Sequence, residues 1–362
     1  MTVAVRQRIV WFAIVAFATA LLAAACSSGD DPAPASDGAA TQPVDAPGAD
    51  AAGTEGRLRV VTTVAPLRSI IENIGGDRIA LTALVPEGTN SHTFEPPPSV
   101  ARELAEANLV IINGLNLELP TLELARTTAP EGVPVVLLAD EAITPNQYVF
   151  DFSFPEEDGN PNPHLWTAPN LAIAYAEIVA DALSDVDPDG GPYYAANLLA
   201  FKTRLTAMDD RFFAVLATIP ESNRKLLTYH DSFPFFASRY GLEIIGAIQP
   251  SDFSEPSPRE IAGLVRQLRD AAVPAIFGSE VFPSEVLDII AVEAGAVQVS
   301  SLRDDDLPGD PGDPENTFVA MMVENVRTMA TVLGGDAAAM DGFDVGDTWT
   351  PYTEFLSLAS DE

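Results

Sequence analysis

Cysteine, histidine and basic residues are scarce in this sequence of 362 residues. Cys26 is the single cysteine, so the chain holds no internal disulfide framework and no site built from several thiolates. Lysine and arginine number 19 against 53 aspartates and glutamates, which gives a formal net charge of −34. Such a surface repels a phosphate backbone, so we expect no nucleic-acid partner. The acidic excess has two interpretations, solubility and attraction of cations, and composition alone does not separate them.

The single cysteine ends a pattern typical of an export signal. Arg6 and Arg8 precede the apolar run Ile9–Leu22, and the small residues Ala23–Ala25 lead into Cys26. The run is shorter than the roughly 20 residues of a membrane span. The segment resembles a bacterial lipoprotein cleavage box, with Cys26 as the lipidated residue. This predicts an extracytoplasmic protein that is lipid-anchored to the cell membrane, at the cell surface or in the periplasm. Ordinary signal cleavage and an uncleaved anchor are the alternatives.

The chain divides by composition into six predicted segments. Residues 27–56 are almost entirely Ala, Asp, Gly, Pro, Ser and Thr, so they bury too little apolar surface to offset the entropy of ordering. The predicted segments are a lipoprotein signal peptide (1–26), a disordered tether (27–56), an N-terminal lobe (57–191), an inter-lobe helix (192–219), a C-terminal lobe (220–335) and an acidic tail (336–362).

Strand and helix patterns alternate in both predicted lobes, which indicates parallel sheets covered by helices. The predicted strands are Leu58–Val64, Ile79–Val85, Leu109–Ile112, Val133–Leu138, Lys225–Thr228, Glu243–Ala247, Ala275–Phe277 and Val297–Val299. The polar stretch Asp140–Pro163 is interpreted as a long loop, and the tail after Gly334 has no strong pattern. The fold class is therefore α/β with two lobes, each a mostly parallel four-stranded sheet with helices on both faces, joined by one long helix.

The long helix is predicted over Pro192–Ile219. Its apolar residues recur at steps of three and four, as on one face of a helix, and are Tyr194, Leu198, Phe201, Leu205, Met208, Phe212 and Leu216. Pro192 suits a first helical turn, and Pro220 ends the pattern. About 27 residues at roughly 1.5 Å rise span about 40 Å. We interpret the helix as a strut between the two lobes.

All three histidines lie in loops that follow predicted strands. His92 follows Ile79–Val85, His230 follows Lys225–Thr228, and His164 comes after the long loop. A lone histidine is more often a satisfied polar residue than a ligand. Ligands of open α/β sheets, however, bind at the carboxyl ends of strands, so three such placements favour one shared site. Three imidazoles without a thiolate suit a borderline divalent cation such as Zn(II).

A carboxylate is expected to complete the ligand set. The triplet Asp304, Asp305 and Asp306 follows the last predicted strand, although an acidic triplet is also typical of a solvated loop. Glu280 follows strand Ala275–Phe277 and is a second candidate. It is alternatively a residue that hydrogen-bonds a ligand imidazole.

Four ordered segments resemble the zinc/manganese ABC-transporter solute-binding family of metal-binding lipoproteins (cluster A-I), which includes proteins once called adhesins. They are NSHTFEPPPSVARELAEANLVIINGLNLE (Asn90–Glu118), NPHLWTAPNLAIAYAEIVADAL (Asn162–Leu183), TYHDSFPFFASRYGLEIIG (Thr228–Gly246) and SEPSPREIAGLVRQLRDAAVPAIF (Ser254–Phe277). The resemblance runs in order from about Arg57 to Leu333. It implies a monomeric, non-enzymatic receptor that captures a divalent metal and passes it to a membrane ABC permease.

By the same resemblance, His92, His164 and His230 are the first three metal ligands, and Asp305, followed by Asp306 and Leu307, is the fourth. Glu280 matches a glutamate that lies near the site. Zinc-specific members often carry a histidine-rich loop, which Asp140–Pro163 lacks, whereas manganese-selective members usually have glutamate where this chain has His230. The ligand set therefore favours Zn(II), with Mn(II) as the alternative metal.

Two other functions remain as alternatives at this point. A zinc-dependent hydrolase would use the three histidines, with Glu280 acting on a bound water. The sequence has no HExxH helix to support it. A surface adhesion protein follows only from the older naming of the family.

Overall fold

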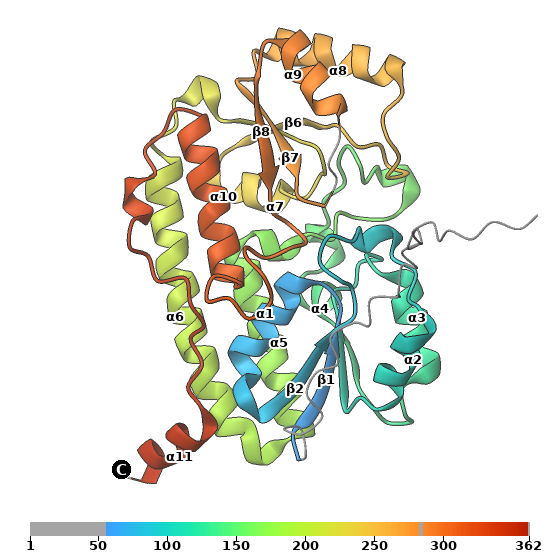
Figure 1. The fold of residues 1–362 in the computed structure, drawn as a ribbon, viewed down its shortest axis with the longest axis vertical. Helices are drawn as coiled ribbons and strands as arrows, with labels where there is room; N and C mark the ends of the chain where they lie inside the picture. Colours follow the sequence, from blue (N-terminus) through green and yellow to red (C-terminus); the bar gives the residue numbers. More distant parts are fainter. Residues whose placement is uncertain (1–55, 282–284, 361–362) are drawn as a thin grey trace, which may run out of the picture. The chain divides into compact units, whose positions relative to one another are not determined.

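Two separate parallel sheets form the framework of the computed structural model, which describes residues 56–281 and 285–360 (Figure 1). The N-terminal sheet has the order β2-β1-β3-β4 and the C-terminal sheet has the order β6-β5-β7-β8. Their strands are β1 (Leu58–Thr62), β2 (Ile79–Ala83), β3 (Leu109–Ile112), β4 (Val135–Leu137), β5 (Lys225–Thr228), β6 (Glu243–Ala247), β7 (Ala275–Ser279) and β8 (Val297–Leu302). The α/β prediction with two four-stranded sheets is confirmed.

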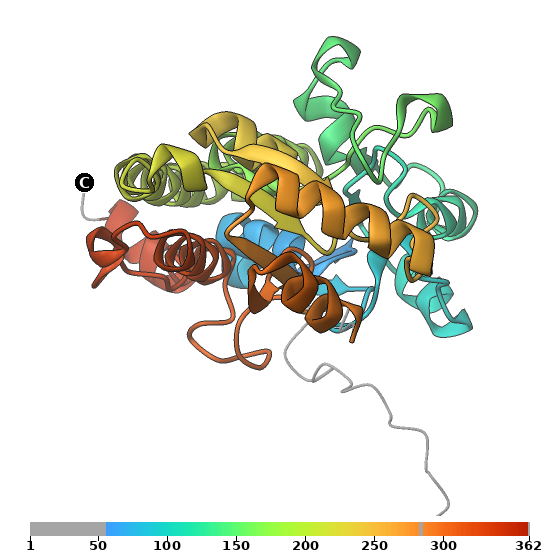
Figure 2. The same ribbon diagram turned by 90° about the horizontal axis from the view of Figure 1, so that it is seen from above.

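Helices cover both faces of each sheet because neighbouring strand residues point to opposite sides. In β1, Val60 packs in the core that contains α1 (Ala65–Gly75) and α5 (Pro169–Val186). Val61 packs against α2 (Pro98–Ala105) and α3 (Leu119–Thr128). In β5, Leu226 faces α7 (Pro234–Tyr240) and α10 (Phe318–Val332). Leu227 faces α8 (Pro258–Ala271) and α9 (Val286–Ala294). Figures 1 and 2 both show α8 and α9 side by side on this second face.

Proline opens most of the helices, as its fixed φ and missing N–H favour the first turn. The helices are α1 (Ala65–Gly75), α2 (Pro98–Ala105), α3 (Leu119–Thr128), α4 (Leu138–Ala142), α5 (Pro169–Val186), α6 (Gly191–Leu216), α7 (Pro234–Tyr240), α8 (Pro258–Ala271), α9 (Val286–Ala294), α10 (Phe318–Val332) and α11 (Tyr352–Ser360). Pro66 opens α1, Pro169 opens α5, and a capping box of Ser257 and Glu260 fixes the start of α8.

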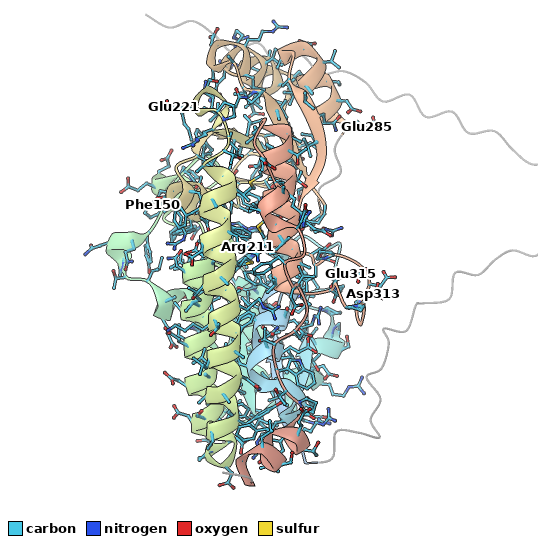
Figure 3. All side chains as sticks on the ribbon, turned by 90° about the vertical axis from the view of Figure 1, so that its left-hand side faces the viewer. Phe150, Arg211, Glu221, Glu285, Asp313 and Glu315 are labelled. Atoms are coloured by element: carbon cyan, nitrogen blue, oxygen red, sulfur yellow. The ribbon has the colours of Figure 1, made fainter. Side chains whose placement is uncertain are left out.

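The long helix α6 runs from Gly191 to Leu216, slightly shorter than the predicted Pro192–Ile219. Of its predicted apolar face, Leu198 is half-buried and every other member is buried. Figure 3 shows α10 beside it. One hydrophobic core runs through both helices and reaches both sheets, with Val60, Leu109, Ile70, Val179, Phe201, Phe277 and Val326 among its members.

The C-terminal segment returns along α6, which the weak sequence pattern does not predict. The backbone N–H of Asp336 donates to Thr218 Oγ1 (2.7 Å), Arg211 donates to the carbonyl of Ala339 (3.1 Å), and Arg204 pairs with Asp344 (2.7 Å). Arg204 and Arg211 lie seven residues apart on α6 and so share one face of the helix, and Thr218 lies just past the C-terminal end of α6. Figures 1 and 3 show the segment passing beside α6 to α11.

The same segment then binds the N-terminal lobe. Asn73 in α1 accepts the backbone N–H of Thr348 through Oδ1 at 2.8 Å. Asp77 accepts the backbone N–H of Tyr352 at 2.9 Å, and Tyr193, at the start of α6 beside this lobe, donates its hydroxyl to the carbonyl of Thr350 at 2.6 Å. Residues 336–352 therefore form a strap, in contact with α6 at one end and with the N-terminal lobe at the other.

Two sequence interpretations need correction or placement. The stretch Asp140–Pro163 is not loop throughout, because Asp140–Ala142 complete helix α4 and two short 3-10 turns follow, Pro145–Gln147 and Glu156–Asp158. The signal peptide (1–26), lipidated Cys26 and the tether up to residue 55 lie outside the described residues. Within the described part of the chain, none of the helices combines the length and apolar character needed to span a membrane.

Candidate metal centre

Three imidazoles meet at the carboxyl ends of the strands of the two lobes. His92 lies in a 3-10 turn (Ser91–Thr93) between β2 and α2, His164 precedes the turn Leu165–Thr167, and His230 is the second residue after β5. The Nε2 atom of His92 lies 3.3 Å from that of His164 and 3.2 Å from that of His230, and the third Nε2–Nε2 distance is 3.0 Å. The structure thus brings together the three histidines that the sequence singles out.

Burial keeps these imidazoles neutral. His164 and His230 are buried, and His92 is partly buried. Loss of hydration lowers the pKa of His230 to about 4. Burial and, secondarily, the neighbouring imidazoles hold the pKa of His92 and of His164 well below its usual range. A neutral imidazole is the form that binds a metal, so the site needs no proton removed from its histidines at neutral pH.

Amide side chains fix which ring nitrogen is free. The Nδ1 of His164 donates to Asn162 Oδ1 at 2.8 Å, and the Nδ1 of His230 donates to Gln249 Oε1 at 2.7 Å. An amide oxygen only accepts, so each ring carries its proton on Nδ1 and presents the lone pair of Nε2 to the other imidazoles.

Sequence reasoning missed these amides, although one signal for them exists. Asn-x-His occurs twice, in Asn90–His92 and in Asn162–His164. In both cases the asparagine oxygen accepts the backbone N–H of the histidine, at 2.9 Å and 3.1 Å. The repeated motif is therefore a local turn that presents the imidazole. Gln249 follows β6 with no such motif.

Glu280 organises the aspartate loop that faces the histidines. Its Oε1 accepts the backbone N–H groups of Asp304, Asp305 and Asp306 at 2.9, 3.1 and 3.0 Å. Trp166 adds a bond from Nε1 to the carbonyl of Asp304 at 2.8 Å. Glu280 therefore contacts the loop that carries the candidate carboxylate ligand; the sequence offered Glu280 as a second candidate ligand or as a hydrogen-bond partner of a ligand imidazole.

Two of the three aspartates offer an oxygen to the site. Asp304 Oδ2 and Asp305 Oδ1 are buried and have no hydrogen-bond partner, and both carboxylates lie with His164 in one group of ligand atoms within 4.8 Å of one another. Asp304 Oδ2 is also 3.8 Å from His230 Nε2. Asp306 points elsewhere, since its Oδ2 accepts the backbone N–H of Gly88 at 2.7 Å.

The buried carboxylates of Asp304 and Asp305 have no cationic partner among the described residues that contact them. Burial raises the pKa of Asp305 to about 7, against the opposing hydrogen bond from Ser91, whose Oγ donates to Asp305 Oδ2 at 2.7 Å. Burial and then the charge of Glu280 raise the pKa of Asp304 well above its usual range. A buried carboxylate with an unpartnered oxygen is unfavourable on its own, and a cation at this position would compensate it. Three imidazole nitrogens with one or two carboxylate oxygens are a ligand set for a divalent transition metal.

Comparison with known proteins agrees with this fold and shows the family to which the chain belongs. Residues 60–332 match the profile of the family described as zinc-uptake complex component A, periplasmic. The chain is 28% identical over 324 residues to the manganese-binding lipoprotein MntA of Halalkalibacterium halodurans, covering 90% of this chain and 98% of that protein. It is 25% identical over 288 residues to the manganese ABC transporter substrate-binding lipoprotein PsaA of Streptococcus pneumoniae, covering 76% and 88%.

A solved structure gives the same result. The periplasmic zinc-binding protein TroA from Treponema pallidum superposes with a TM-score of 0.70 at 25% identity, covering 77% of this chain and 99% of TroA. The chain therefore belongs to the family of zinc-uptake complex component A, whose members are metal-binding substrate-binding proteins of ABC transporters.

Proposed function

We propose that this protein captures a divalent transition metal outside the cytoplasm, with Zn(II) preferred and Mn(II) as the alternative, and delivers it to an ABC permease. The observation that supports it most directly is the approach of the three Nε2 atoms to 3.0–3.3 Å, opposite unpartnered carboxylate oxygens. Tetrahedral Zn(II) with bonds of about 2.0–2.1 Å places its nitrogen ligands about 3.3–3.4 Å apart. The spacing of the imidazoles lies just below that value, so small side-chain shifts would admit the ion.

The proposed ligands are His92, His164, His230 and Asp305. Asp305 supplies Oδ1, because its other oxygen is held by Ser91. Asp304 offers a second free oxygen next to His230, so its charge also stabilises the cation. The names of the relatives include both zinc and manganese, and the third imidazole supports zinc because nitrogen ligands suit Zn(II) better than Mn(II).

The hydrolase alternative requires Glu280 to act as a base on a metal-bound water. Its Oε1 already accepts three backbone N–H groups of the aspartate loop. Removing those bonds would free the loop that carries the proposed carboxylate ligand. We therefore propose a receptor and not an enzyme.

The names of the relatives, which are lipoproteins, support a proposal that this protein is attached to the membrane. We propose that Cys26 carries the lipid and that residues 27–56 tether the metal-binding part of the chain. A Cys26→Ala variant expressed in a bacterial host should move from the membrane fraction to the soluble extracytoplasmic fraction. An unchanged membrane fraction would contradict lipidation at this residue.

Competitive titration with Zn(II) and Mn(II) tests metal capture. We expect His230→Ala and Asp305→Asn to weaken zinc binding about 100-fold or more, because each removes a ligand from a buried charged site. Asp306→Asn is the matched control, since its carboxylate binds Gly88 and should leave affinity within about three-fold. If Asp304→Asn weakens binding and Asp305→Asn does not, Asp304 is the carboxylate ligand. Absence of binding by the wild-type protein, or full binding by His230→Ala, would refute the proposal.

A further inference from the structure

The loop between β6 and α8 places one aromatic ring against the metal centre. Ser251, Asp252, Ser254 and Glu255 are exposed, whereas Phe253 between them is partly buried. Its ring stacks on the imidazole of His92, with centroids 4.4 Å apart and planes at 17°. A residue of the C-terminal lobe thus covers a proposed ligand of the N-terminal lobe.

The backbone of Phe253 adopts a conformation that a bulky residue rarely takes. Its φ is +58°, in the left-handed region that favours glycine. Two hydrogen bonds hold this conformation. The backbone N–H of Phe253 donates to the carbonyl of Pro250 at 3.0 Å, and Asp252 forms an Asx turn in which its carboxylate accepts the backbone N–H of Ser254 at 3.1 Å. Backbone outliers of this kind cluster at functional sites, because the surrounding contacts must maintain them.

Phe253 is also connected to His230. Gln249 accepts the Nδ1 proton of His230 through Oε1 at 2.7 Å and donates from Nε2 to the carbonyl of Phe253 at 3.2 Å. The ring of Phe253 therefore contacts one imidazole, while its carbonyl is one side chain away from another. The two imidazoles belong to different lobes.

The position of the ring matters because His92 is the least covered of the three imidazoles. His164 and His230 are buried, whereas His92 is partly buried and lines a cavity of about 100 Å³. Phe253 and Phe154 line the same cavity and lie on His92, with Phe154 5.5 Å from its ring centre. A metal that leaves the site must first lose a ligand, and His92 has open space beside it into which it can turn.

We propose that Phe253 is a positioning residue that holds His92 against the metal and thereby slows metal release through this cavity. The inference rests on the proposed function, since it concerns the rate at which the captured ion leaves. Rotation of His92 into the cavity breaks the stack with Phe253 before the metal is free. We therefore expect the ring of Phe253 to affect mainly the rate of metal release. The rate of metal binding depends on the other ligands as well.

Stopped-flow transfer of Zn(II) from the full-length protein to excess chelator measures this rate. Phe253→Ala should release zinc about two- to ten-fold faster, the range expected for loss of one aromatic contact. Phe253→Tyr, which keeps the stacked ring, should restore the slow rate, and Phe253→Leu should not. Phe152→Ala is the matched control, because Phe152 is 51% exposed on the neighbouring loop.

A glycine variant distinguishes a loss of stability from the loss of the aromatic contact. Phe253→Gly removes the ring but suits the positive φ, so it should unfold at a higher temperature than Phe253→Ala and release zinc as fast. Tight wild-type binding with unchanged release from both variants would overturn the inference alone. Absence of zinc binding by the wild type would overturn the proposed function and this inference together.

Discussion

The contact between the C-terminal strap and helix α1 provides a stability prediction that does not depend on the metal. Asn73 is 1% exposed, and its amide makes four hydrogen bonds. Oδ1 accepts the backbone N–H of Thr348 at 2.8 Å and its hydroxyl at 3.0 Å, while Nδ2 donates to Asp347 and to the carbonyl of Ser69, each at 2.9 Å. One buried side chain thus joins the strap to the N-terminal lobe.

Replacing Asn73 with alanine removes these bonds without adding new ones. Asp347 is exposed and can bind water instead, and the carbonyl of Ser69 remains within a helix. Thr348 is half-buried, so its N–H and hydroxyl lose partners at a position with limited access to water. At about 1 kcal/mol for each of these two bonds, we expect the free energy of unfolding to fall by about 2 kcal/mol.

Urea unfolding followed by circular dichroism measures this loss, and limited proteolysis shows whether the strap detaches first. The control is Thr203→Ala on the exposed side of α6, where the hydroxyl donates to the carbonyl of Leu199 one turn earlier. That change should shift stability by less than about 0.5 kcal/mol. Equal unfolding curves for the two variants, together with unchanged cleavage after residue 336, would refute the assignment of the strap as a stabilising tie.

Three further predictions concern Glu118, Glu280 and Phe201. Burial raises the pKa of Glu118 from 4.5 to about 7, so the native state keeps a proton that the unfolded state releases between these values, and stability falls as pH rises through that window. Glu118→Gln removes this dependence. In urea unfolding, the free energy of unfolding of the variant minus that of the wild type should therefore rise by up to about 3 kcal/mol between pH 4.5 and 7.5. A difference that stays constant over this pH range would contradict titration of Glu118 in the native state. Glu280→Ala should weaken zinc binding about 10- to 100-fold in calorimetry, as loss of a group that orients a ligand does, while exposed Glu285→Ala should leave it unchanged. Phe201→Ala should lower the free energy of unfolding by about 3–5 kcal/mol, against less than about 0.5 kcal/mol for Leu199→Ala, which is 68% exposed; similar losses would argue against the shared core.

Local patterns were sufficient for most of the framework. Strands β3, β5 and β6 have the predicted bounds because short β-branched or leucine-rich runs are enclosed by polar turns. Helix α4 was missed because Leu138–Ala142 continues directly from a strand with no turn residue between them. Helix α11 was missed because its anchors, such as Asp77, lie far away in the sequence.

The site was predictable only in part, because some of its contacts also join residues that are far apart in the sequence. The position of each histidine after a strand indicates that the three imidazoles share an edge, and the Asn-x-His turns are visible locally. The hydrogen bond of Gln249 to His230, and those of Glu280 to the backbone of the aspartate loop, depend on how loops from different strands pack. The spacing of residues along the sequence does not predict this packing. The choice among Asp304, Asp305 and Asp306 likewise depends on which oxygens are left free once Gly88 has bound Asp306 and Ser91 has bound Asp305.

The extent of lobe movement follows from the packing between the lobes. A long helix resists bending, and α6 shares one hydrophobic core with α1, α5 and α10 that continues into both sheets. Asp305 of the C-terminal lobe already accepts a hydrogen bond from Ser91 of the N-terminal lobe. The strap (residues 336–352) also connects α6 to α1. Wide opening would expose this core, so release should proceed through side-chain and loop movement at His92 and Phe253. X-ray scattering of the metal-free and zinc-loaded protein should then give nearly equal radii of gyration, and a large decrease on zinc binding would show that the lobes close as rigid bodies instead.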